Sequence, residues 1–302
     1  MRTPDIPPNP ARVSRSLGDR LRAEAKRRGR SAGDLRREFV FQRFLGRVFA
    51  EPGSRWVLKG GTGLLVRIQR ARPSKDVDLV VPAAAFDLDK AVAALRTDIA
   101  ADAGDHLTFV VDSLARSSDE PTIALLRITC LIEARPLERF TIDLSTRTRL
   151  TAKADRIRPR PVLDLAGATP LPRFVLYPLP DQVADKLCAM YGQYGPAQQP
   201  STRYRDLVDL VLITTTTELD ATMTIRAITT ETARRNCPLP PAIESPGPEW
   251  QAGYARVARE LPLESNLRTL PGAIETVATC LNPVLAATAT GTWNPRTRRW
   301  QA

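Results

Sequence analysis

Residues 56–81 read WVLKGGTGLLVRIQRARPSKDVDLVV, and most of the fold prediction rests on this stretch. The apolar run Trp56–Leu58 predicts a short strand. The glycine-rich segment Lys59–Gly63 then predicts a tight turn into a helix that continues through Leu64 and Ile68. A glycine turn at a helix N-terminus presents backbone N–H groups to an anion, although it is equally typical of a plain connection between strand and helix.

Two aspartates lie in the strand predicted at the end of that stretch. Apolar residues alternate along Val77–Val81, so Asp76 and Asp78 share the opposite face, because side chains in a strand repeat with period two. Carboxylates this close together on an apolar strand are costly unless they are paired or bind a metal. Asp143, inside another apolar run, predicts a third carboxylate on a neighbouring strand. A strand-end turn or a solvated face explains an Asp-x-Asp pair equally simply, and both interpretations stay open here.

Carboxylates on adjacent strands suit one kind of chemistry in particular. Phosphoryl and nucleotidyl transfer requires that the triphosphate be positioned and its charge neutralised. Magnesium ions held by a few carboxylates do this, and two ions about 3.5–4 Å apart clamp the attacking and leaving oxygens. A site for two Mg²⁺ ions needs two or three carboxylates on adjacent strands, and the three aspartates meet that need.

The remaining sequence predicts a mixed sheet followed by a helical half, an α/β (α+β) fold. Prolines are frequent between residues 156 and 180, which indicates a connection between two lobes. Further strands are expected at 107–113, 122–133 and 140–144. Helices are expected at 16–30, with Ser16 as N-cap, and at 32–50, 181–193, 204–212, 220–235, 248–261 and 267–287.

Composition narrows the class of protein. The chain has 302 residues, 43% of them hydrophobic and 25% charged, as in folded globular proteins, and no apolar run approaches the roughly 20 residues that cross a bilayer. One histidine and four widely spaced cysteines give little to build a zinc site, so a cytoplasmic chain with reduced cysteines is the plain interpretation. The net charge of +11 favours a polyanionic partner, although a compositional bias toward arginine explains it too.

Four motifs occur in a fixed order along the chain. K-G-G-T-x-L at 59–64 is followed by S-K-D-x-D-L at 74–79, and two later motifs lie on predicted helices: A-D-K-L-x-A at 184–189 and R-x-R-D-L-x-D-L at 203–210. In this order they resemble the AbiEii/MenT-type toxin nucleotidyltransferases, a branch of the polymerase-beta-like superfamily. The resemblance spans roughly residues 55–255, and includes a weaker W-x-x-x-Y feature at Trp250 and Tyr254.

The resemblance implies a nucleotidyltransferase of the EC 2.7.7 type. Together with the proline-rich connection, the sequence predicts three domains: a flexible arm at 1–15, a nucleotidyltransferase lobe at 16–165 and a helical lobe at 166–302. Asp76, Asp78 and Asp143 would hold two Mg²⁺ ions, and Lys186 and Asp209 would join them as catalytic residues. The nucleotide-binding residues that the resemblance implies are Gly60, Gly61, Thr62, Ser74, Lys75, Lys186 and Arg205.

The resemblance also implies partners: an NTP substrate, the 3′ end of a tRNA as acceptor with blocked aminoacylation as the consequence, and a cognate antitoxin protein. No membrane partner is expected. The basic helix at 16–30, extended by Arg36 and Arg37, is the candidate for acceptor contact, although a solvated face or an acidic protein partner explains its charges nearly as well.

Simpler interpretations of single residues remain. Lys186 could pair with Asp185 at the surface, and Arg205 could pair with Asp209 four residues later. Two tyrosines, Tyr191 and Tyr204, are expected to pack between helices rather than to stack on a base.

Rival functions also remain open at this point. The chain could transfer the nucleotidyl group to a protein hydroxyl, including its own at Ser74 or Thr62, or to a small molecule such as an aminoglycoside. It could also be a non-catalytic module that binds nucleic acid or a partner. The high positive charge disfavours a cationic drug as acceptor, and the intact motif residues argue against loss of activity.

Overall fold

The computed structural model describes residues 10–81, 87–117, 120–146, 150–195 and 198–302. Contacts between Cα atoms divide the chain into two compact units. The first comprises residues 1–67, 73–149 and 156–176, and the second comprises residues 68–72, 150–155 and 177–302. The predicted arm at 1–15 falls outside the described residues as far as residue 9.

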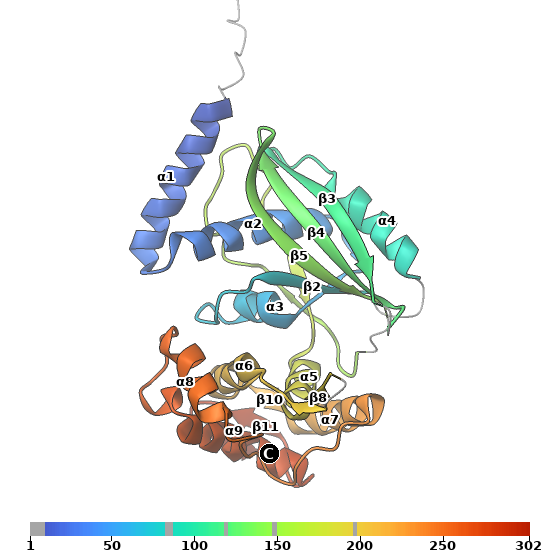
Figure 1. Ribbon diagram of the computed structural model, residues 1–302, viewed down its shortest axis with the longest axis vertical. Helices are drawn as coiled ribbons and strands as arrows, with labels where there is room; N and C mark the ends of the chain where they lie inside the picture. The colour runs from blue at the N-terminus through green and yellow to red at the C-terminus, as the bar shows by residue number, and fades with distance from the viewer. Residues whose placement is uncertain (1–9, 82–86, 118–119, 147–149, 196–197) are drawn as a thin grey trace, which may run out of the picture. The chain divides into compact units, whose positions relative to one another are not determined.

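The first unit is built on a seven-stranded mixed sheet with strand order β3-β4-β5-β2-β1-β7-β6 (Figure 1). The pairs β2–β5 and β1–β7 are parallel, whereas β1–β2, β3–β4 and β4–β5 are antiparallel. The α/β (α+β) fold class with a mixed sheet is therefore confirmed. The strands are β1 (Val57–Lys59), β2 (Asp76–Val80), β3 (Leu107–Arg116), β4 (Ile123–Ile132), β5 (Arg135–Ser145), β6 (Asp155–Ile157) and β7 (Phe174–Leu176).

One face of this sheet packs against α2, which crosses β3–β5 in Figure 1. Phe44 of α2 makes edge-on ring contacts with Phe109 and Phe140, and Phe41 makes another with Phe140. These phenylalanines are buried and form the core between helix and sheet. The helices of this unit are α1 (Pro10–Arg28), α2 (Ala32–Val48), α3 (Gly60–Arg67) and α4 (Leu88–Ile99).

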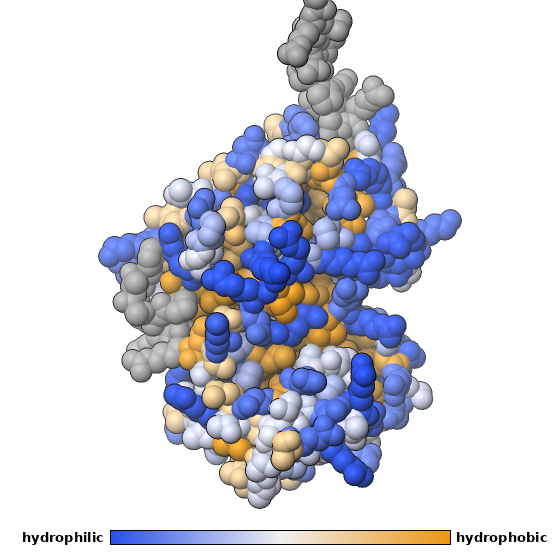
Figure 2. All heavy atoms as spheres, turned by 180° about the vertical axis from the view of Figure 1, so that it is seen from behind, coloured by the Kyte–Doolittle hydropathy of each residue, from blue (hydrophilic) through white to orange (hydrophobic). Residues whose placement is uncertain are grey.

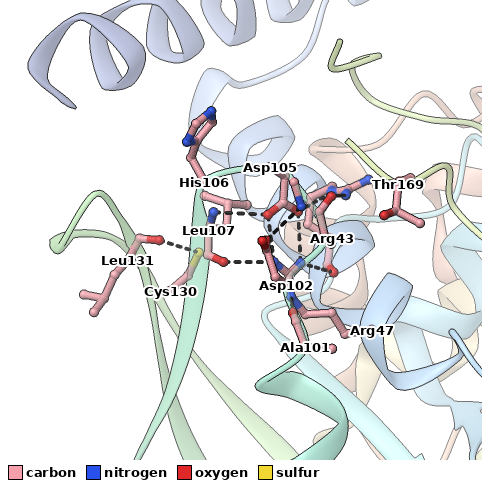
Figure 3. A network of polar contacts seen from close by, with 12 residues as sticks. Arg43, Arg47, Ala101, Asp102, Asp105, His106, Leu107, Cys130, Leu131 and Thr169 are labelled. Atoms are coloured by element: carbon pink, nitrogen blue, oxygen red, sulfur yellow. Dashed lines mark hydrogen bonds and ion pairs between the residues drawn. The ribbon is translucent and has the colours of Figure 1, made fainter. Parts of the chain in front are cut away.

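A buried ion cluster ties α2 to the segment before β3 (Figure 3). Asp105 accepts from Arg43 Nε over 2.6 Å and from both terminal nitrogens of Arg47 over 2.9 and 2.7 Å. The Asp105 side chain is fully buried. Burial alone raises the pKa of that carboxyl, but the two guanidinium groups outweigh burial and hold the pKa below its ordinary value.

The N-terminal helix differs from its prediction. Helix α1 begins at Pro10, so Ser16 lies inside the helix and does not cap it. Proline is favoured in the first turn because its φ suits a helix and its missing N–H would have no partner there. The proline-rich stretch predicted to connect two lobes also contributes β6 and β7, and β7 joins the sheet by pairing Leu176 with Leu58.

The second unit is mainly helical. Its large buried aromatic residues are Trp250, Tyr254 and Trp293, and Trp293 Nε1 donates to the Thr214 carbonyl over 2.7 Å. A three-stranded sheet of β10, β11 and β12 was not predicted. The elements are α5 (Leu179–Tyr191), β8 (Gln193–Tyr194), β9 (Gln199–Pro200), α6 (Tyr204–Thr216), β10 (Leu219–Asp220), α7 (Ala221–Arg235), α8 (Trp250–Arg259), η1 (Asn266–Arg268), α9 (Leu270–Leu285), β11 (Thr292–Asn294) and β12 (Arg299–Gln301).

Charged side chains are prominent on the surface. Figure 2 shows hydrophilic side chains over much of the face that it draws, with hydrophobic side chains visible between them, in a chain with 44 Lys and Arg and 33 Asp and Glu residues. Among the described residues, no helix is both long enough and apolar enough to cross a membrane.

Candidate active site

The three predicted metal-binding aspartates lie on one face of the sheet in the first unit. In the parallel pair β2–β5, Asp78 stands opposite Asp143 and Asp76 stands opposite Thr141. Residues paired across neighbouring strands project to the same face. Asp76 and Asp78 are partly exposed whereas Val77 between them is buried, and Asp143 is exposed. The structure therefore brings the three predicted carboxylates to one accessible face.

Gly60 allows the N-terminus of α3 to approach the Asp78 carboxylate. Its φ is 67°, in the left-handed region that glycine adopts without steric cost. A Cβ at this position would collide with the carboxylate of Asp78. Because a helix N-terminus carries partial positive charge, this approach stabilises negative charge at Asp78. Both requirements explain why glycine stands here.

Two hydroxyl groups hold Asp76 in place. Ser74 Oγ donates to Asp76 Oδ1 over 2.8 Å, and Thr62 Oγ1 donates to the Asp76 carbonyl over 2.7 Å. Both side chains are buried. Gly61 is buried in the first turn of α3, and Lys75 is exposed between Ser74 and Asp76. In this structure Ser74 and Thr62 thus position the first aspartate.

The donors fit a divalent cation in kind. Carboxylate oxygens are the ligands that Mg²⁺ prefers, and these three share an accessible face beside a helix N-terminus. In the part of the chain that the structure describes, no group of three or more His, Cys, Asp or Glu side chains is arranged to hold a metal ion. The strand register brings the three aspartates to one face, but their side chains do not converge on one point in this structure. To share a cation they would have to change rotamer and turn toward one another.

The second unit holds a buried ion network around Lys186 of α5. Lys186 Nζ donates to Asp209 Oδ2 over 2.5 Å and to Asp206 Oδ1 over 3.1 Å, and both aspartates lie on α6. Arg72 donates to the two oxygens of Asp209 over 3.0 and 2.9 Å. The Asp209 side chain is fully buried. The network therefore places two cations on one buried carboxylate.

The protonation states in this network follow from its charges. Burial lowers the pKa of Lys186, but the carboxylates of Asp209 and Asp206 outweigh burial and raise the pKa above its ordinary value. Burial likewise raises the pKa of Asp206, but Lys186 and Arg203 outweigh it and the pKa lies below its ordinary value. Lys186 is therefore an ammonium ion and Asp206 a carboxylate at neutral pH.

The alternative pairings considered from the sequence do not form in the described structure. Asp185 is the neighbour of Lys186 along the chain, but its carboxylate accepts from Arg235 Nη2 over 3.1 Å. Arg205 is exposed, and among the described residues no ion pair joins it to Asp209. Lys186 and Asp209 therefore share one buried network instead of forming separate surface pairs.

Arg72 is a member of this network that the sequence analysis missed. It lies four residues before Asp76 along the chain, in the short segment 68–72 that packs with the second unit. No periodic pattern singles it out, and its partner Asp209 is 137 residues away in sequence. The one available signal is a basic residue two positions before the S-K-D-x-D-L motif.

The aromatic residues considered for base stacking pack between elements of the second unit. The ring of Tyr204 meets that of Trp250 edge-on with centroids 5.1 Å apart. Tyr191 donates its hydroxyl to the Glu244 carbonyl over 2.8 Å. Tyr254 is fully buried. The predicted packing between helices is confirmed for Tyr204, which contacts Trp250 of α8, whereas Tyr191 bonds to the segment between α7 and α8.

The chain is similar to proteins of known structure, and the likeness to the first of them extends to the fold. MenT4, a nucleotidyltransferase toxin from Mycobacterium tuberculosis H37Rv, is 19% identical with a TM-score of 0.50, and the match covers 93% of this chain and 99% of that protein. JHP933 from Helicobacter pylori is 14% identical with a TM-score of 0.47, and the match covers 85% of this chain and 94% of that protein. No curated protein sequence matches the chain.

The family assignment rests on the sequence as a whole. The family model described as the nucleotidyl transferase AbiEii toxin of type IV toxin–antitoxin systems matches residues 43–282, which include all four motifs. The resemblance inferred from those motifs is thereby confirmed. The chain belongs to the AbiEii family of nucleotidyltransferase toxins of type IV toxin–antitoxin systems.

Proposed function

We propose that this chain transfers a nucleotidyl group from an NTP to the 3′ end of tRNA in a Mg²⁺-dependent, EC 2.7.7-type reaction, and so blocks aminoacylation in the cytoplasm until its antitoxin neutralises it. The observation that carries the proposal is the pairing of Asp78 with Asp143 across β2–β5, with Asp76 on the same face. Membership of a toxin nucleotidyltransferase family supports it. The positive charge of the chain favours an RNA acceptor.

The reaction needs few covalent steps from the protein. A hydroxyl group of the acceptor loses its proton to solvent and its oxygen bonds to the α-phosphorus of the NTP, while the bond from that phosphorus to the oxygen bridging to the β-phosphate breaks and pyrophosphate leaves. Asp76, Asp78 and Asp143 would hold Mg²⁺, which neutralises the charge that develops on the phosphate oxygens. The residues that we assign to nucleotide binding and catalysis besides these are Gly60, Gly61, Thr62, Ser74, Lys75, Lys186, Arg205 and Asp209.

The burial of two hydroxyls disfavours autotransfer onto them. Ser74 and Thr62 are 5% and 3% exposed, and each donates its hydroxyl hydrogen to Asp76. An attacking oxygen must reach the α-phosphate from outside, which neither side chain does without breaking that hydrogen bond. An external acceptor is therefore the better-supported choice.

The test incubates the purified chain with each labelled NTP separately, total tRNA, and either Mg²⁺ or EDTA. We expect label on tRNA with the wild type and Mg²⁺, and none with EDTA or with the double variant Asp76→Ala/Asp78→Ala. The variant Asp164→Ala, at an exposed aspartate outside the site, is the matched control and should keep full transfer. Label on the protein instead of tRNA would support transfer to a protein hydroxyl. Toxicity that survives in the double variant would overturn the catalytic assignment.

A further inference from the structure

The face of β3–β5 that carries Asp143 lies opposite the face packed against α2. Along β5 the side chains of Phe140, Ile142 and Leu144 are buried, whereas Asp143 and Arg139 are exposed. The exposed side of β5, together with the residues that stand opposite it on β4 and β3, is called the open face here. Its members, by register, are Arg139, Thr141 and Asp143 on β5, Leu125, Arg127 and Thr129 on β4, and Val110, Ser113 and Ala115 on β3.

Exposed aliphatic side chains lie on the open face. Val110 is 41% exposed and Leu125 is 37% exposed, and only Tyr194 joins them as a large hydrophobic residue exposed within the described ranges. Leu125 stands directly opposite Asp143 in the β4–β5 pair. Exposed apolar side chains beside an active site indicate a surface that a substrate covers.

Two arginine side chains on the open face are not engaged within the described residues. Arg127 and Arg139 are exposed, and neither guanidinium group makes a hydrogen bond or an ion pair with another residue that the structure describes. In the strand register Arg127 on β4 stands opposite Thr141 on β5, and Thr141 stands opposite Asp76 on β2. Arg127 therefore lies two strands, about 10 Å, from the first aspartate. Arg127 and Arg139 are diagonal neighbours, with backbones about 7–8 Å apart. They can therefore reach phosphates of one nucleic acid strand.

Two acidic residues lie close to these arginines: Asp143, which is on the open face itself and is a diagonal neighbour of Arg127, and Asp112 on β3. Asp112 lies at the bulge between Val111 and Ser113 of β3, and its carboxylate accepts from the Thr129 hydroxyl over 2.6 Å. Among the described residues neither carboxylate forms an ion pair with Arg127 or Arg139, so both guanidinium groups are available for an external anion.

The basic helix α1 offers a contrast. Arg22 is bonded to Asp19, and Arg27 and Arg28 are both bonded to Glu24, each over 2.5 Å. Two carboxylates of α1 thus hold three of its arginines. Arg22, Arg27 and Arg28 are engaged by their own helix, whereas Arg127 and Arg139 are in no ion pair among the described residues.

We propose that the acceptor RNA strand reaches the aspartates along the open face, with Arg127 and Arg139 contacting its phosphates and Leu125 and Val110 packing against its bases and riboses. This inference rests on the proposed function, since it names the path of the acceptor. Arginine is suited to phosphate because its planar fork donates two parallel hydrogen bonds. Such contacts position RNA without reading its sequence.

The test compares two double variants that remove the same charge: Arg127→Ala/Arg139→Ala on the open face, and Arg22→Ala/Arg27→Ala on α1. Binding of fluorescent tRNA is measured without NTP across a salt series. We expect the open-face variant to bind about tenfold more weakly, with a salt slope smaller by about 1.4 for two lost single-strand phosphate contacts. The α1 variant should match the wild type, and Arg127→Lys/Arg139→Lys should recover most of the affinity because it keeps the charge.

Transfer kinetics separate this inference from the proposed function. With active enzyme, the open-face variant should raise the KM for tRNA and leave the KM for NTP unchanged. Transfer to tRNA with an unchanged KM in the open-face variant would overturn the inference and leave the proposed function standing. If the wild type transfers nothing but the open-face variant loses RNA affinity, the proposed function is overturned and the contact between RNA and the open face stands. RNA affinity that is unchanged together with lost neutralisation by the antitoxin would show that the face binds protein, and would overturn the inference.

Discussion

Replacing Asp209 with alanine should destabilise the second unit by about 3–5 kcal/mol, the usual cost of leaving buried charges without their partner. The carboxylate accepts from Arg72 over 3.0 and 2.9 Å and from Lys186 over 2.5 Å, and its side chain is 0% exposed. Without it, Arg72 loses a two-point contact, and of the two carboxylates that hold Lys186 only Asp206 remains. Because the free energy of unfolding of a typical domain is about 5–15 kcal/mol, this loss is a large fraction of the total stability.

Urea unfolding followed by tryptophan fluorescence measures this loss, since Trp250 and Trp293 are buried in the second unit. The control is Arg203→Ala, which removes a cation from the same network at a side chain that is 57% exposed. That pair should contribute about 1 kcal/mol or less. If Asp209→Ala costs no more than Arg203→Ala, the buried cations find other partners and the reasoning is wrong.

Three further outcomes are expected. Gly60→Ala should lose about 1–3 kcal/mol of stability through its left-handed φ and should abolish tRNA labelling, because the new Cβ displaces the Asp78 carboxylate; full labelling would contradict this. Asp105→Ala should lose about 3–5 kcal/mol in urea unfolding, because it leaves two buried guanidinium groups without their carboxylate. The pKa values of Asp105 and Asp206 are lowered, so their contribution to stability is present above the unfolded-state pKa of about 3.9 and is lost as pH falls below it. Urea midpoints from pH 7 to pH 3 should show this fall, and Asp105→Asn should reduce it.

Period-two alternation was sufficient to place Asp76 and Asp78 on one face of a strand, and the observed burial of Val77 between them agrees. The order of strand, glycine segment and helix was likewise predicted correctly, but residues 60–63 lie in the first turn of α3 and do not form a separate turn before it. These features depend on neighbours along the chain, so a local pattern carries them. The start of α1 was placed too late because a proline was not considered as a first-turn residue.

Local sequence was enough to identify the family, the fold class and the candidate catalytic residues of this protein, because each motif is contiguous and its spacing reflects strand or helix geometry. Partners that are distant along the chain were settled only by tertiary packing. The pairing of Asp78 with Asp143 depends on strand register, and the ion network joins Arg72 to Asp209 across 137 residues. The same holds for the arginines: the sequence shows their number, but packing decides which of them are paired with carboxylates and which are not.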